Sequence, residues 1–323
     1  MKKVAVAALL ALFAGGAFGK GGHAGNGNEP ILQKLDPIIH FLNTWSPNVF
    51  HARENYLRNV DADKGPTCRR ADLENSIDAQ WDVQYKDDVA ALRASVKNQP
   101  ATPALDDPTK GLADTFMSLA TSLAEAKKYY GDGEYKKDSC KKGQALHAKL
   151  MADWKKYSEE DRAVRKFATD LHDSIAEVEL KTVEKRSGKQ FHYYLLKTVI
   201  DAKKVMDVFE SNWDTKDADL TAMQAALNTY AKTADGLKEF EAKHHADSDS
   251  YGYSAFASKA DRFLTTAKDY RDRKVTKTPF SDQEIQYLKK GGAGVKGGLP
   301  ILISAYNTLV EKHNEVSIPS NVK

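Results

Sequence analysis

Hydrophobic residues recur at intervals of three and four positions along almost the whole chain after residue 30. This spacing matches the 3.6-residue turn of an α-helix, and no period-two alternation is long enough to indicate a strand. The pattern therefore predicts an all-α protein. Breaks containing glycine or proline separate the expected helices. These cover residues 30–60, 70–97, 107–130, 139–186, 190–210, 217–245, 253–274, a short stretch after 281, and 299–315.

Proline and glycine positions refine this picture. Pro47 allows either two helices or one kinked helix in the first segment, and residues 98–108, with three prolines, are expected to form an extended connector. Residues 139–186 contain no proline and only Gly143, which predicts one very long helix with coiled-coil-like packing. No interior linker is both long and polar. We therefore expect a single domain over residues 29–323, an elongated helical bundle.

The N-terminus has the organisation of an export signal. Residues 1–19 comprise Lys2 and Lys3, an apolar run, and small residues that end at Gly19, after which cleavage is expected. The apolar run is too short to span a bilayer. Residues 20–28 are rich in glycine and asparagine and are expected to form a flexible tether. The mature chain is thus expected to be soluble, periplasmic or secreted, and without a transmembrane segment.

Charge narrows the range of partners. The formal net charge of +3 falls to +1 when Lys2 and Lys3 are removed with the leader. A nearly neutral exported chain lacks the basic surface of a nucleic-acid binder. The expected partner is instead an envelope protein or a cell-wall component.

Two cysteines, Cys68 and Cys140, remain in the mature chain. In an oxidising compartment an even pair indicates a disulfide, which would stabilise the fold by roughly 4 kcal/mol through the loop that it closes. Two unpaired thiols are the alternative. A redox-active role is not expected, because no C-x-x-C spacing is present to lower a thiol pKa.

Several segments resemble a bacterial family of predicted lipoproteins of unknown function, the YiiG-like family. They are GQALHAKLMADWKKYSEEDRAVRKFATD (143–170), KQFHYYLLKTVIDAKKVMD (189–207), AYNTLVEKHNEV (305–316), and the shorter FLNTW, ENYL and DKGPTC. The resemblance covers nearly all of the mature chain. It implies an all-helical, envelope-associated protein, and it brings no catalytic residues with it. This chain differs from the lipoprotein members in having no cysteine next to the expected cleavage point that could be lipidated, which puts membrane anchoring in question.

Motifs for nucleophilic and metal chemistry are sparse. Ser139 begins an S-x-x-K match, but its companion motifs are missing, so a helix start with a capping serine is the favoured interpretation. Neither H-E-x-x-H nor zinc-type cysteine spacing occurs, and the G-x-H-x-x-E motif of imelysin-type proteins fails around His23, which lacks the glutamate. Weak metal candidates lie together near one helix end. They are His244, His245, Asp247 and Asp249.

Three further features carry alternative interpretations. Carboxylates at 159–161, 177 and 179 fit solvated helix faces better than a glycosidase pair. The glycine-rich loop 291–298 fits a hinge or a tightly packed connector better than an anion-binding nest. Tyrosines gather at expected helix ends, where they either pack or line a groove for a sugar or peptide. They are Tyr129, Tyr130, Tyr135, Tyr193, Tyr194, Tyr251 and Tyr253.

These observations favour a non-enzymatic binding or scaffold protein of the cell envelope, with no catalytic residue and no cofactor assigned. Two alternatives remain open. One is a hydrolase with an unrecognised site that uses Ser139 or a carboxylate pair, and the other is a metal or small-ligand carrier that uses His244 and His245.

Overall fold

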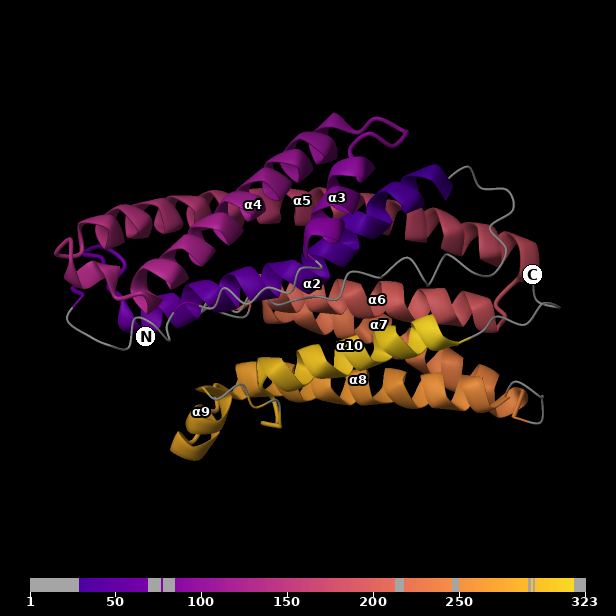
Figure 1. Cartoon of the computed structure of the whole chain (residues 1–323). Helices are drawn as coiled ribbons and strands as arrows, with labels where there is room; N and C mark the ends of the chain where they lie inside the picture. Colours follow the sequence, from indigo (N-terminus) through magenta and orange to yellow (C-terminus); the bar gives the residue numbers. More distant parts are fainter. Residues whose placement is uncertain are drawn as a thin grey trace. The chain divides into compact units, whose positions relative to one another are not determined.

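The computed structural model describes residues 29–68, 77, 85–212, 218–245, 250–289, 292 and 294–316. Within these ranges the chain is helical and has no β-strand, which confirms the predicted all-α helical bundle (Figure 1). The elements are α2 (Glu29–Asn59), α3 (Tyr85–Ser95), α4 (Pro103–Gly131), the 3-10 helix η2 (Glu134–Lys136), α5 (Lys141–Ser187), α6 (Phe191–Ser211), α7 (Leu220–Lys243), α8 (Ser250–Thr276), α9 (Asp282–Lys289) and α10 (Leu299–Glu315).

The long fourth helix is confirmed as the 47-residue α5. The first segment is one helix, because α2 continues through both Pro37 and Pro47. The helix expected over 70–97 is described only as α3, since residues 69–76 and 78–84 lie outside the described ranges.

The start of α4 corrects the expected start at Asp107. Pro103 occupies the first turn of α4, where its missing N–H costs no hydrogen bond, and Thr102 precedes it as the N-cap. The fully buried Lys34 of α2 fixes this start. Its ammonium group donates to the backbone oxygens of Asn98 and Pro100 and to the carboxylate of Asp106, at 2.8 to 3.0 Å. The proline-rich connector is therefore tied to α2 from inside the bundle.

The helices group into two compact units, residues 27–172 and residues 173–323 of the described chain. Helix α5 contributes its first part to the former and its last part to the latter. One domain over 29–323 and coiled-coil packing of α5 both stay predictions.

The N-terminal unit is centred on the buried ring of Phe116 in α4. Edge-to-face contacts join Phe116 to Phe41 (5.1 Å between ring centroids) and Trp45 (5.9 Å) of α2, and Tyr157 of α5 lies 6.4 Å away. Such aromatic pairs add to the free energy gained by burying apolar area. Hydrophobic residues that recur at helical spacing in α2, α4 and α5 thus meet in one core.

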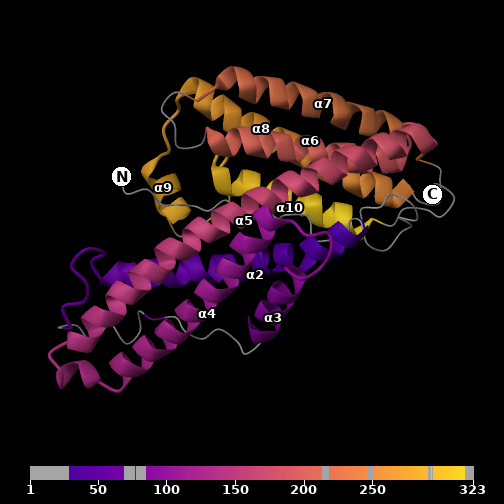
Figure 2. The ribbon, with the colours of Figure 1, turned by 90° about the horizontal axis from the view of Figure 1, so that it is seen from above.

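The C-terminal unit is a bundle in which α6 packs on α7, α7 on α8, and α8 on α10 (Figure 2). Its core includes the fully buried Tyr230, Phe263 and Tyr306, with ring centroids 5.1 and 5.9 Å apart along the series. Across the described residues, no helix combines the length and the apolar character needed to cross a membrane.

Candidate functional site

The two cysteines form the predicted disulfide. Cys68 follows the turn after α2, Cys140 precedes α5, and their Cα atoms lie 5.8 Å apart. A second tie runs parallel to it, because the Gln144 side chain donates to the backbone oxygen of Pro66 at 2.9 Å. The disulfide therefore fastens the turn after α2 to the start of the long helix.

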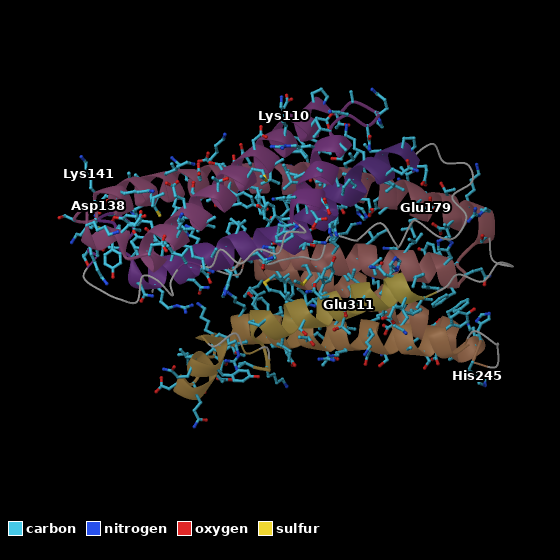
Figure 3. The ribbon with its side chains drawn as sticks, viewed as in Figure 1. Lys110, Asp138, Lys141, Glu179, His245 and Glu311 are labelled. Atoms are coloured by element: carbon cyan, nitrogen blue, oxygen red, sulfur yellow. A yellow bond between two sulfur atoms is a disulfide. The ribbon has the colours of Figure 1, made fainter. Side chains whose placement is uncertain are left out.

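Asp138, rather than the expected Ser139, caps α5. Its carboxylate accepts hydrogen bonds from the backbone N–H groups of Lys142 and Cys140 and from the hydroxyl of Tyr129. Figure 3 labels Asp138 beside Lys141, the first residue of α5. The Lys142 N–H, followed by the Tyr129 hydroxyl, lowers the pKa of this carboxyl below its usual value. Ser139 itself lies exposed in the turn with φ at 54°, a left-handed conformation. Sequence spacing pointed to the neighbouring residue because both types commonly cap helices.

The three adjacent carboxylates at 159–161 differ in burial and in the residues that they contact. Glu159 is exposed, Glu160 approaches Gly111 of α4, and Asp161 is buried. Asp161 accepts the hydroxyl of Ser46 at 2.5 Å and pairs with Arg165 at 3.2 Å. Sequence analysis missed this buried link between α2 and α5, because it joins residues far apart in the chain.

The carboxylates farther along α5 also separate. Glu177 forms an ion pair with Lys204 of α6 at 2.5 Å, whereas Glu179 is buried. Neither the carboxylates at 159–161 nor those at 177 and 179 are therefore brought together as the facing pair that a glycosidase uses.

The histidine candidates bond to their own helix end. Nδ1 of His244 lies 2.8 Å from the backbone oxygen of Phe240, and Nδ1 of His245 lies 2.9 Å from that of Ala242. Figure 3 labels His245 at this end of the molecule. The His244 ring also stacks on Phe240 at 4.0 Å. Asp247 and Asp249 lie outside the described residues. In the described part of the chain, no three His, Cys, Asp or Glu side chains are grouped to hold a metal ion.

The tyrosines singled out from sequence mostly pack inside the two units. Tyr129, Tyr130 and Tyr135 are buried and form a chain of ring contacts beside the disulfide turn. Tyr253 packs on Phe191 with centroids 4.1 Å apart. These rings contribute to the core, and the side chain of Tyr251 lies outside the description.

Helix α9 is a surface element fixed at its start. Ser281 and Glu284 form a capping box, in which the Ser281 N–H donates to Glu284 at 2.8 Å and the Glu284 N–H donates back to the Ser281 hydroxyl at 3.3 Å. Arg273 of α8 pairs with Glu284 at 3.0 Å and stacks on Phe280. The Ser281 N–H and then Arg273 lower the pKa of Glu284. These bonds hold α9 at the end of α8, beyond the bundle (Figure 1).

The described glycines of the loop after α9 pack tightly. A Cβ atom on Gly292 would lie 2.2, 2.3 and 2.5 Å from Cε1, Cδ1 and Cζ of Tyr287, and one on Gly294 would lie 3.3 Å from the Tyr287 hydroxyl. Gly297, at φ +69°, approaches the backbone oxygen of Asp269. At these described positions the loop is therefore a tightly packed connector rather than a hinge or an anion-binding nest.

Tyr287 is a candidate that sequence analysis missed. Half of its side chain is exposed (50%), although it is a large aromatic residue. Among the described residues, the exposed large apolar side chains are Phe167, Val178, Val275, Ile285 and Tyr287. Three of the five belong to α9 and the last turn of α8. The sequence signal that could have identified Tyr287 is an aromatic residue in the last turn of an expected helix, followed by glycines.

Comparison with known proteins places the chain in a family. The model of a family described as "Protein of unknown function (DUF3829)" matches residues 29–315. The chain belongs to this family. It is also 27% identical over 228 residues to the Escherichia coli (strain K12) protein named "Uncharacterized protein YiiG". That similarity covers 70% of this chain and 62% of the relative's length. No solved structure matches.

Membership in DUF3829 confirms the YiiG-like resemblance. The matched residues include the disulfide, both helical units and α9. The family description assigns no activity to DUF3829, so the function has to be argued from the side chains of this chain.

Proposed function

We propose that this DUF3829 protein is an exported, non-enzymatic binding protein of the cell envelope, with α9 as part of its binding surface. The observation that carries the proposal is the exposed ring of Tyr287 on a helix held in place by Arg273 and Glu284. Monomeric proteins commonly use their exposed apolar patches for binding.

The carboxylates that could act as a general acid or base form hydrogen bonds and ion pairs within the protein, which supports a binding role over a catalytic one. Asp138 caps a helix, Asp161 holds Ser46 and Arg165 inside the N-terminal unit, and Glu177 pairs with Lys204. A general acid or base must reach a substrate atom to act. Groups engaged in these contacts serve the packing of helices.

The disulfide supports export. Thiols in the bacterial cytosol are kept reduced, whereas the periplasm and the exterior favour disulfides. Together with the leader and its expected cleavage after Gly19, the Cys68–Cys140 bond supports a periplasmic or secreted location. The mature protein would then begin at Lys20.

Two measurements test this function. Mass spectrometry of the chain recovered from the cell envelope should find Lys20 at the N-terminus, whereas an unprocessed cytosolic chain contradicts export. Mature wild-type protein, immobilised and exposed to solubilised envelope, should retain a component that the Tyr287→Ala variant releases. Equal retention by both proteins, or by neither, contradicts a binding role for α9.

A further inference from the structure

We propose that Cys68 and Cys140 are a reversible redox pair, which exchanges its disulfide with a dithiol reductant and remains folded in both states. This role goes beyond the proposed binding function and does not involve α9. It depends on a buried hydroxyl beside one sulfur atom, on the other contacts of that sulfur, and on bonds that hold the turn at 61–68 without the disulfide. These features stabilise the reduced state, whereas C-x-x-C spacing lowers a thiol pKa, so the missing motif does not argue against them.

The hydroxyl of Tyr130 lies beside the sulfur of Cys140. A Cβ on Gly143, the third residue of α5, would lie 2.8 Å from Tyr130 Oη and 2.9 Å from Cys140 Sγ, so both atoms border the same space. Tyr130 is fully buried, and within the described part of the chain its hydroxyl has no hydrogen-bond partner. Leaving a buried polar group without a partner costs free energy. The oxidised protein is therefore destabilised at this hydroxyl, and a nearby acceptor would remove the penalty.

Glycine at position 143 keeps the space between these two groups open. Its φ lies outside the left-handed range, so the backbone conformation does not require glycine there. Glycine is unfavourable inside a helix relative to alanine. The gain from glycine is instead space, because a side chain would separate the Tyr130 hydroxyl from the Cys140 sulfur. With Gly143 in place, the Cys140 side chain can turn toward the hydroxyl once the S–S bond is broken.

Reduction gives the hydroxyl a partner. A cysteine thiol is both a weak donor and a weak acceptor of hydrogen bonds. The Cys140 thiol can accept from Tyr130 and donate to the backbone oxygen of Pro66, which lies 3.7 Å from its sulfur. In the disulfide this sulfur has no proton to donate. Burial, and next the neighbouring Tyr129, raises the pKa of Tyr130, so its hydroxyl keeps its proton and remains a donor.

The reaction is thiol–disulfide exchange. Cys68 is half-buried and Cys140 is buried, so a thiolate of the reductant attacks Cys68 Sγ. The S–S bond of the protein breaks, a mixed disulfide forms at Cys68, and Cys140 leaves as a thiolate that takes up the proton lost by the reductant. Asp138, which accepts the Cys140 N–H, disfavours a lasting negative charge on this sulfur. The second thiol of the reductant then displaces Cys68, so both cysteines end as thiols and the reductant ends as a disulfide.

Other bonds keep the two cysteines near each other after reduction. The Gln144 side chain donates to the backbone oxygen of Pro66 at 2.9 Å, and Nε2 of His147 lies 3.2 Å from the backbone oxygen of Ala62. Both contacts join the turn at 61–68 to α5 independently of the disulfide. The pair can therefore be oxidised again within the folded protein.

Redox equilibration of the full mature protein tests the proposal. The protein is equilibrated with mixtures of reduced and oxidised dithiothreitol and alkylated, and the oxidised fraction is measured by mass spectrometry. The equilibrium constant for reduction of Tyr130→Phe should be about fivefold smaller than that of wild type, because the variant gains no hydrogen bond on reduction. Tyr157→Phe removes a hydroxyl of the same unit that bonds to Ser46, and as the matched control it should keep the wild-type constant. An unchanged constant in Tyr130→Phe, or an equal decrease in both variants, overturns the proposal.

Further measurements separate a redox pair from a purely structural disulfide. Glutathione should be trapped on Cys68, reduced wild-type protein should keep the circular dichroism of the oxidised form, and the NMR signal of the phenolic carbon of Tyr130 should shift on reduction. An adduct on Cys140, loss of helix on reduction, or an unmoved Tyr130 signal overturns the proposal. Oxidised Tyr130→Phe should be at least as stable as oxidised wild type. A less stable variant overturns the proposal as well, because the hydroxyl would then have a partner in the oxidised protein.

Discussion

Replacing His313 by glutamine should make the folded protein less sensitive to acid. His313 lies in α10 with only 3% of its surface exposed, and its ring is near Phe256 of α8, 6.3 Å between centroids. Burial, and next the nearby His192 of α6, lowers the pKa of His313 from 6.5 to about 3. The folded protein therefore holds this imidazole neutral at pH values where the unfolded chain protonates it.

The direction of the effect follows from proton binding. A histidine with a lowered folded-state pKa contributes its full stability above pH 6.5, and that stability is lost as the pH falls from about 6.5 toward about 3. At pH 5 the unfolded histidine is almost fully protonated, which removes about 2 kcal/mol from the free energy of unfolding. This value changes little with the folded-state pKa as long as that pKa remains below about 4.

Urea unfolding measures the difference. The free energy of unfolding of wild type and His313→Gln is compared at about pH 8 and about pH 5. The loss on acidification should be about 2 kcal/mol smaller in the variant, because the variant lacks the buried imidazole that only the unfolded chain protonates. Hydrogen exchange of α6 and α10 peptides locates the change in the C-terminal unit if the two units unfold separately.

Equal losses of stability in wild type and variant would refute the reasoning. They would mean that His313 is protonated in the folded protein near pH 5, and therefore that its ring reaches solvent or a carboxylate.

Three further predictions concern the interior. Cys68→Ser with Cys140→Ser should lower the free energy of unfolding by about 4 kcal/mol, measured by urea unfolding, and reductant should then have no added effect on the variant. Lys34→Met should cost about 3 to 5 kcal/mol by leaving the Asp106 carboxylate without its buried cation, and adding Asp106→Leu should restore part of the loss; no restoration would exclude the unpaired charge as the cause. Phe263→Ala should cost about 3 to 5 kcal/mol in a thermal melt, and a loss below about 1 kcal/mol would contradict its place in the core.

The helical architecture could be predicted because helix periodicity is local. Apolar side chains three and four residues apart must share one face of a helix, so the stripes of α5 and α10 follow from the sequence alone. The disulfide could be predicted because the chain contains only two cysteines. Helix starts were less certain, as at Asp138 and Pro103, because several neighbouring residues can cap a helix and the choice depends on which one finds its partners.

Tertiary structure alone decided which polar groups are internal and which large aromatic side chain stays half exposed. Ser46 and Asp161, or Lys34 and Asp106, meet only after helices distant in sequence have packed. In the sequence Tyr287 looks like any other tyrosine at a helix end, and only the structure shows that Gly292 lies against its ring. Periodicity fixes the direction of a side chain around its own helix axis, whereas its exposure depends on what the rest of the chain places against it.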